Sequence, residues 1–193
     1  MSTTAYHHGD LRNALIEAGI AYINKNGTNQ LSLRKVAAEC GVSHTAPYSH
    51  FKDKEDLLEA MKNYVSDKFA EALQRALNES TEQGSAFAVR NLGKAYVGFF
   101  NINPQYYEFI FERADFDIDL DDLDKVNSYK PFEIFKNAVK ILFDERGLSR
   151  DRQRTALIEM WGLVHGLAGI SVMKGIKFSG NWPEITQKII IIE

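Results

Sequence analysis

The sequence predicts an all-α protein in which a small N-terminal helix-turn-helix domain of three helices precedes a larger helical bundle. Three observations indicate this fold class. Apolar residues recur at intervals of three and four along almost every periodic segment, which is the period of a helix rather than the alternation of a strand. Glycine and proline occur where these segments stop or start. The composition of the 193 residues, 45% apolar and 25% charged, is that of an ordinary globular protein.

The first expected helix runs from Asp10 to Asn26. Asp10 is suited to cap its N-terminus, and Gly27 follows its last turn, where glycine favours termination. Its apolar residues lie at i, i+4, i+7 and i+11 and so share one face, formed by Leu11, Leu15, Ala18 and Tyr22. We expect this helix to brace the two that follow.

The segment 32–51 carries the most informative pattern in the chain. Ser32 can cap a short helix, and Gly41 can adopt the left-handed conformation that ends one. Between them, apolar residues fall at helical spacing on one face: Leu33, Val36 and Ala37. A short amphipathic helix followed by a glycine turn and a second helix is typical of a DNA-reading helix-turn-helix.

The second helix of this motif is predicted to expose a polar face of small residues. Val42 is expected to fill the corner between the helices, and Ser43 offers a second cap. Pro47 cannot donate to a helix ladder and is tolerated only in a first turn, so this helix is expected to start at or after His44. Its polar N-terminal face suits a major groove, which is about 12 Å wide.

The order and spacing of these features resemble the N-terminal region of TetR-family transcriptional regulators. The resemblance covers the helix at 10–26, the glycine break, SLRKVAAECGVS at 32–43, YSHF at 48–51 and KDKEDLL at 52–58, about the first third of the chain. Farther on, WGLVHG at 161–166 resembles the signature of a C-terminal regulatory domain of that family, the WHG domain.

The resemblance implies base-edge contacts at His44, Thr45 and Ala46 and phosphate contacts at Tyr48 and Lys54. Thr45 can donate or accept at a base edge, Ala46 can touch a thymine methyl group, and the Tyr48 hydroxyl suits a phosphate oxygen. The full set of expected DNA-binding residues is Ser32, Arg34, Ser43, His44, Thr45, Ala46, Tyr48, His50 and Lys54. The alternative is that the histidines and Tyr48 only pack or solvate the surface.

The remainder of the chain, 52–193, is expected to bind an effector and form the dimer, with 1–51 as the DNA-binding domain. Asp53 can cap a long helix that continues to about Asn78 and connects the two domains. Loops are expected at 79–84 and at the acidic segment 115–124, whose spacing does not meet the glycine and glutamate requirements of a calcium loop. The further helices are expected at 85–103, at 105–113 after Pro104, at 130–146, at 151–174, and from Pro183 through the final isoleucines, where a strand is the alternative.

Aromatic residues concentrate between Tyr96 and Phe116 and at the WGLVHG segment. They line an apolar effector pocket or belong to the core, which the sequence does not separate. The pocket prediction names Tyr96, Phe99, Phe100, Tyr106, Phe109, Trp161 and His165. The helix at 151–174, apolar on nearly every side, is expected to be central and buried.

The resemblance implies that the last two helices pair across a two-fold axis as a four-helix bundle. The predicted interface consists of a stripe of glycines and of terminal isoleucines: Gly162, Gly166, Gly169, Ile185, Ile189 and Ile190. The alternative for the glycine stripe is packing inside one subunit.

The charge distribution and the single cysteine favour a DNA-binding protein of a reducing compartment. Residues 1–52 carry a net charge of +2 within a chain of −3, which fits a phosphate-facing domain on an acidic body. The single cysteine, Cys40, is interpreted as a small buried apolar residue in a reducing compartment. We expect a cytoplasmic homodimer with no membrane span, cofactor, metal or enzymatic activity, acting as a DNA-binding, ligand-responsive repressor of a pseudo-palindromic operator. The alternative function is a small-molecule-binding helical protein whose N-terminal domain contacts proteins rather than DNA.

Overall fold

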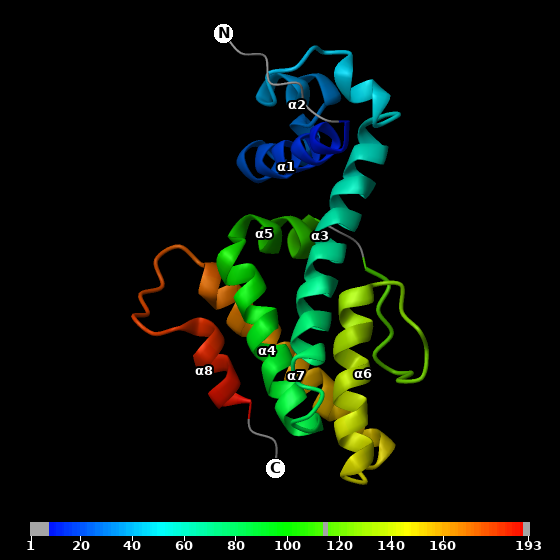
Figure 1. Ribbon diagram of the computed structural model, residues 1–193, viewed down its shortest axis with the longest axis vertical. Helices are drawn as coiled ribbons and strands as arrows, with labels where there is room; N and C mark the ends of the chain where they lie inside the picture. Colours follow the sequence, from blue (N-terminus) through cyan, green and yellow to red (C-terminus); the bar gives the residue numbers. More distant parts are fainter. Residues whose placement is uncertain (1–7, 114–115, 191–193) are drawn as a thin grey trace. The chain divides into compact units, whose positions relative to one another are not determined.

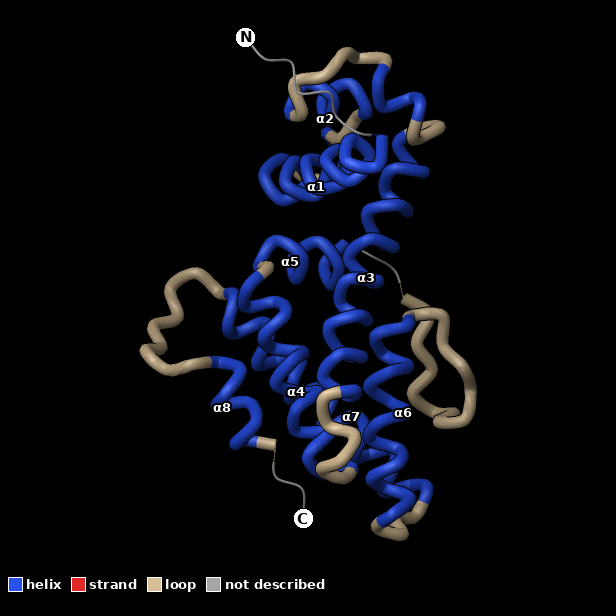
Figure 2. The backbone as a smooth tube through the Cα atoms, in the orientation of Figure 1, coloured by secondary structure: helices blue, strands red, loops and turns tan. Residues whose placement is uncertain are grey.

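The computed structural model describes residues 8–113 and 116–190, and every regular element within them is helical (Figure 1, Figure 2). The prediction of an all-α protein is therefore confirmed for the described residues. The chain forms two compact units: unit 1 is Met1–Val65 with Glu108–Ala114, and unit 2 is Ser66–Tyr107 with Asp115–Glu193. Two helices, α3 (Lys54–Asn78) and α5 (Pro104–Arg113), contribute residues to both units.

Unit 1 is a helical domain with a continuous apolar core. It contains α1 (His8–Asn26), the 3-10 helix η1 (Thr28–Gln30), α2 (Leu33–Glu39), the 3-10 helix η2 (Ala46–Ser49) and the first turns of α3. Gly19 allows α1 to approach α3 closely, because a Cβ atom there would lie 2.6 Å from Met61 Sδ. The almost fully buried side chains of this core include Leu15, Ile16, Ile20, Ile23, Val36, Phe51, Leu57 and Met61.

Helix α4 (Ser85–Ile102) is the central helix of unit 2. It contacts α6 (Lys130–Glu145), α7 (Arg150–Val172) and α8 (Trp182–Ile189). Gly93 permits the contact with Ile190, the residue that follows α8, since a Cβ atom there would collide with Ile190 Cδ1. Asn91 ties α4 to the end of α3 by donating to Ala76 O and Ser80 Oγ, both at 3.0 Å.

The C-terminal helix is shorter than predicted. Helix α8 ends at Ile189, and Ile190 follows it in an extended conformation as the C-cap. The expectation that the helix includes Ile190 is wrong, because this residue leaves the helix to pack against Gly93 of α4. Ile191 and Ile192 lie outside the described residues.

Helix α7 is not buried on all sides, contrary to prediction. Ala156, Leu157, Val164 and Ala168 are buried, whereas Ile158 and Ile170 are 46% and 40% exposed. By length and composition alone α7 is also long and apolar enough to cross a membrane. That criterion is weak evidence, because a core helix of a soluble protein passes it as well.

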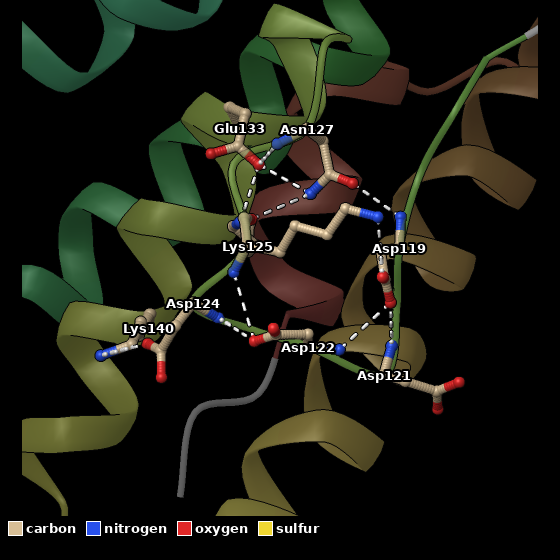
Figure 3. A network of polar contacts seen from close by, with 9 residues as sticks. Asp119, Asp121, Asp122, Asp124, Lys125, Asn127, Glu133 and Lys140 are labelled. Atoms are coloured by element: carbon tan, nitrogen blue, oxygen red, sulfur yellow. Dashed lines mark hydrogen bonds and ion pairs between the residues drawn. The ribbon is translucent and has the colours of Figure 1, made fainter.

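The acidic segment is a loop, as predicted, and hydrogen bonds hold it together. We call residues 116–129 the acidic loop (Figure 3). Asn127 holds it together: its Oδ1 accepts from Asp119 N at 2.6 Å, and its Nδ2 donates to Glu133 Oε1 at 2.8 Å. Glu133 Oε1 also lies 2.7 Å from Lys136 Nζ, whose residue is only 2% exposed. This ion pair lies within α6, and both of its members bind the loop: Glu133 accepts from Asn127, and Lys136 donates to the carbonyl oxygen of Lys125.

The acidic loop is also fastened within itself and to α7. Figure 3 shows Lys125 reaching across the loop to Asp119, and the two charged groups lie 3.0 Å apart. Asp124 accepts from Arg150 at the start of α7, at 2.7 Å. Among the described residues, no cluster of three or more potential metal-ligating side chains occurs.

Candidate nucleic-acid interface

Helix α2 begins and ends as the sequence predicts. Ser32 is extended, with φ −151°, and its hydroxyl accepts a hydrogen bond from Lys35 N at 3.3 Å. At the other end Gly41 has φ +65°. Gly41 N donates to Ala38 O at 3.1 Å and Val42 N to Ala37 O at 3.0 Å, the pair of bonds that defines a Schellman motif. The turn after α2 is therefore sharp and has a fixed direction.

The second helix of the motif is a single 3-10 turn rather than the α-helix we expected. It spans Ala46–Ser49, with Pro47 in its first turn. Ser43 does not cap it; the Ser43 hydroxyl lies 3.2 Å from Thr45 Oγ1, while Ser43 O accepts from Ala46 N at 3.0 Å. The proline explains the difference, because it supplies no N–H for an α-helical ladder and disfavours helical dihedrals in the residue before it.

The turn presents polar side chains outward on a buried support. We call residues 41–50 the reading corner. Pro47 is buried and Ala46 half-buried, which fixes the turn on the domain. Tyr48 is 55% exposed. The other exposed side chains of the corner are Ser43, His44, Thr45 and Ser49, so three of the four expected base or phosphate contacts in the turn face solvent and Ala46 does so in part.

His50 is placed differently from the other expected contacts. It is half-buried, and its Nε2 atom is buried without a hydrogen-bond partner. Its ring centroid lies 6.3 Å from that of Phe51. Arg12, which the sequence analysis did not select, is exposed, and its guanidinium lies 5.4 Å from the Phe51 ring centroid. Arg12 therefore adds a cation beside the end of the reading corner.

The start of α3 supports the reading corner from its C-terminal side. Asp53 accepts from Asp56 N at 2.9 Å, which caps the helix as expected, and the Asp56 carboxylate accepts from Lys52 N at 2.8 Å. Lys54, the first residue of α3, is half-buried. Arg34 on α2 is exposed, whereas the Ser32 hydroxyl is already engaged in its capping bond.

Cys40 is half-buried rather than fully buried. Its Sγ atom donates to Ala14 O at 3.5 Å, which joins the end of α2 to α1. Burial, assisted by the nearby Glu39 carboxylate, raises the pKa of the Cys40 thiol. The thiol is therefore held in its protonated form, consistent with a packing role.

The predicted pocket residues of unit 2 lie in an aromatic cluster. Phe69 of α3 stands at its centre, with ring centroids 4.8 Å from Tyr96, 4.9 Å from Phe99 and 4.7 Å from Phe100. Tyr106 stacks on Phe99 at 5.9 Å, and Phe109 is buried in the part of α5 that belongs to unit 1. Rings that contact one another directly are the packing of a core, so the assignment of these residues to a pocket stays a prediction.

His165 joins three helices through a polar network inside this cluster. Its Nδ1 lies 3.3 Å from the hydroxyl of Tyr96 on α4, and its Nε2 lies 3.3 Å from that of Tyr107 on α5. Tyr107 also donates to His165 O at 3.3 Å, so it contacts both the ring and the backbone of His165. Burial lowers the pKa of His165 and favours the neutral ring. Trp161, one turn earlier, packs against Phe132 at 5.0 Å.

The predicted dimer residues divide into two groups. Gly162 and Gly166 are exposed, and a Cβ atom at either would meet nothing within 4 Å. Gly169 instead faces Tyr107 of the same chain, where a Cβ atom would lie 2.6 Å from the hydroxyl. Ile189 is 39% exposed, whereas Ile190 is only 4% exposed because it packs on α4. Ile185 is half-buried.

A short first helix, a Schellman turn and an outward-facing polar second turn define a helix-turn-helix protein. Comparison with protein families identifies which one. The pattern described as "Bacterial regulatory proteins, tetR family" matches residues 15–61, and the pattern described as "Tetracyclin repressor-like, C-terminal domain" matches residues 89–188. The second match covers more than half of the chain and includes the WGLVHG segment. The chain belongs to the TetR family of regulators.

Similar curated proteins align with the N-terminal part of the chain. The transcriptional regulator BetI of Yersinia pestis is 36% identical over 66 residues, 34% of this chain and 33% of that protein. A helix-turn-helix regulator of Mycobacterium tuberculosis, not characterised further, is 31% identical over 109 residues, 56% of this chain and 45% of that protein. The chain thus spans about a third to a half of the length of these relatives.

Solved structures of similar fold extend over nearly the whole chain. The fatty acid degradation regulator FadR of Bacillus halodurans has a TM-score of 0.65 and 19% identity, covering 94% of this chain and 93% of that one. A TetR-like transcriptional regulator of Rhodococcus has a TM-score of 0.67 and 13% identity, covering 95% of each chain. At this identity the likeness shows the fold alone.

Proposed function

We propose that this protein is a homodimeric transcriptional repressor that binds a pseudo-palindromic DNA operator and releases it when a small molecule binds unit 2. The reading corner is the observation that supports DNA binding. It exposes His44, Thr45 and Tyr48 on a turn whose backbone is held by hydrogen bonds before and after it. Repression as the sign of regulation is supported by the family's description as tetracyclin repressor-like.

Recognition would combine base contacts from the corner with phosphate contacts around it. Thr45 and His44 carry groups that can donate or accept at base edges in the major groove. Tyr48, Arg34 and the first turn of α3 supply hydroxyl, guanidinium and ammonium donors for the backbone. Arg12 extends this set of cations by one.

Dimerisation is supported by an apolar stripe on the outer face of α7. Ile158, Gly162, Gly166 and Ile170 are exposed and follow one another at intervals of four residues, which places them along one ridge of the helix. The glycines leave room for close approach of a second helix, and the isoleucines provide apolar area to bury. A copy of the same stripe across a two-fold axis would cover both.

The direct test is a gel-shift titration of the protein against the DNA upstream of its own gene, repeated at several salt concentrations. We expect a saturable shift whose affinity falls steeply as salt rises, because phosphate contacts release counterions. Absence of binding to this and to a randomised duplex library would overturn DNA recognition.

The dimer is tested by charging the stripe. Ile170→Asp should give monomers in sedimentation and weaken operator binding, whereas Val126→Asp, at a position 81% exposed in the acidic loop, should leave dimers intact. Ile190→Asp is not an equivalent test, since Ile190 is buried within its own subunit. Dimers of unchanged stability in Ile170→Asp would exclude the α7 stripe as the interface.

A further inference from the structure

A groove on unit 2 lies apart from the aromatic cluster and has no role in the proposed DNA contacts. It has a volume of about 290 Å³ and runs between α3, α4 and α6. Each helix presents one face to it at helical spacing. The lining residues are Gln74, Leu77, Ser85, Ala88, Ile134, Asn137, Ala138 and Ile141.

The groove is open because two of its lining residues are alanines. Ala88 of α4 and Ala138 of α6 carry only a methyl group, and Ala138 is 8% exposed. Ile141 at the edge is 57% exposed and adds apolar surface to the rim of the groove. A ligand seated over the alanines would cover this apolar surface.

The chemistry of the lining selects an uncharged occupant. No lining residue of the groove is ionisable, so a charged ligand would lose hydration without gaining an opposite charge. Three neutral polar groups stand at the rim. Gln74 donates to Asn78 Oδ1 at 3.0 Å and keeps its own carbonyl oxygen available, Ser85 donates to Glu145, and Asn137 is exposed.

We propose that this groove binds a small, uncharged and largely apolar molecule that carries one amine, amide or hydroxyl group, and that it is the effector site of the regulator. A volume near the lower end of ligand pockets fits a molecule of two or three rings. The effector role rests on the proposed function, whereas binding itself does not.

Helix α3 supplies the coupling. Gln74 and Leu77 lie near the end of the same unbroken helix that begins at Lys54, next to the reading corner. A ligand that binds more tightly to one position of α3 relative to α6 increases the population of that conformation. The shift changes the conformations populated by the first turn of α3. By linkage, DNA must change the affinity for the ligand by the same factor as the ligand changes the affinity for DNA.

The test uses N-phenyl-1-naphthylamine, a neutral two-part aromatic probe with one N–H donor whose fluorescence rises in apolar surroundings. The full chain should bind one probe per subunit. Ala138→Phe fills the groove and should weaken binding at least about tenfold, equivalent to about 1.4 kcal/mol. Ile141→Arg, at an exposed position that tolerates a charge, should do the same if Ala138→Phe does not fold. Val126→Phe, which adds a ring outside the groove, should leave affinity unchanged.

Equal probe affinity in both folded groove variants would overturn the site and place the probe elsewhere, for example in the aromatic cluster. Probe release on dimerisation, seen as binding that falls with protein concentration, would mean that a second copy occupies the groove. If the protein without probe does not bind DNA, the proposed function is wrong. The fluorescence measurement still shows whether the groove binds the probe. Operator affinity unchanged by saturating probe would overturn the effector role alone.

Discussion

The reading corner and the acidic loop are both short polar surface segments, yet they use their side chains in opposite ways. In the acidic loop, side chains satisfy the backbone: Asp119 Oδ1 accepts from Asp121 N, and Asp122 Oδ1 accepts from Asp124 N, both at 3.0 Å. In the reading corner the backbone satisfies itself, through bonds such as Tyr48 N to Thr45 O at 3.2 Å and His50 N to Pro47 O at 2.9 Å.

The difference indicates which segment is built to bind something else. Among the described residues, the side chains of His44 and Tyr48 make no hydrogen bond within the protein, so their donors and acceptors stay available to a partner. In the acidic loop, Asp119 is paired with Lys125, and Asp124 is paired with Arg150 of the same unit. In a binding surface, a rigid backbone carries side chains whose polar groups are free to bond a partner. In a structural loop, the polar groups of the side chains are already hydrogen-bonded within the protein.

The largest effect is expected from breaking the ion pair under the acidic loop. Glu133→Ala leaves the buried ammonium of Lys136 without its carboxylate and should destabilise the protein by about 3–5 kcal/mol. Urea denaturation measures this. The double variant Glu133→Leu with Lys136→Met removes both charges and should recover much of the loss. A single variant as stable as the parent would show that the buried ammonium of Lys136 does not depend on the Glu133 carboxylate.

A smaller loss is expected from the turn that positions the reading corner. Gly41→Val forces a β-branched residue to φ +65° and should cost about 2 kcal/mol of unfolding free energy. Gly41→Asn should lose less, because asparagine tolerates this conformation. Operator affinity should fall in the valine variant beyond what its stability loss explains. Equal losses for valine and asparagine would argue against the backbone cause.

These two regions also show what sequence can and cannot predict. The Ser32 cap, the Gly41 turn and the Asp53 cap follow from local rules, because each depends on one residue and its own backbone. The 3-10 form of η2 was missed although Pro47 signalled a restriction, since the choice between α and 3-10 depends on how the buried ring packs. The hydrogen bonds that hold the acidic loop were not predicted, because their partners Glu133 and Lys136 lie on the following helix.

Contacts between distant segments account for the remaining errors. Gly169 and Gly162 look equivalent in a helical stripe, and only the position of Tyr107 separates them. From the sequence, Ile190 is indistinguishable from the other isoleucines of an amphipathic helix. Its packing against Gly93 of α4 is visible only in the structure. Spacing along one helix predicts which residues share a face, but which face meets which neighbour is decided by the rest of the chain.

The reading corner is tested most sharply by removing one oxygen. Tyr48→Phe retains the ring and removes a hydroxyl proposed to bond a phosphate, so operator affinity should fall by about tenfold, near 1.5 kcal/mol. Affinity for unrelated DNA should fall by the same factor, whereas Thr45→Val should change the preferred base. Fluorescence anisotropy on a panel of duplexes measures both. An unchanged affinity in Tyr48→Phe would remove the phosphate role, and unfolding should be unaffected because the hydroxyl has no partner in the protein.

The carboxylates of the acidic loop and of Glu133 should make the free energy of unfolding depend on pH. The hydrogen bond from Lys125, with those from the backbone N–H groups of Asp122 and Asp121, lowers the pKa of Asp119. Partial burial acts to raise the pKa of Glu133, but hydrogen bonds from Lys136 and Asn127 outweigh it and the net shift is downward. A carboxyl whose pKa is lower in the folded state stabilises the fold above its unfolded pKa, near 4, and loses that stabilisation as pH falls through the folded pKa.

The free energy of unfolding should therefore decline as pH is lowered from about 5 toward 3. Asp119→Asn removes one of three carboxyls in the described part of the chain whose pKa is lowered, the others being Glu133 and Asp144, and should make this decline shallower while leaving the stability near pH 3 almost unchanged. Chemical denaturation at a series of pH values measures the slope. The opposite pattern, a parallel offset at every pH, would mean that the Asp119 side chain acts through its acceptor geometry and not its charge. In that event the loop would be held as the reading corner is, by hydrogen bonds that do not depend on ionisation.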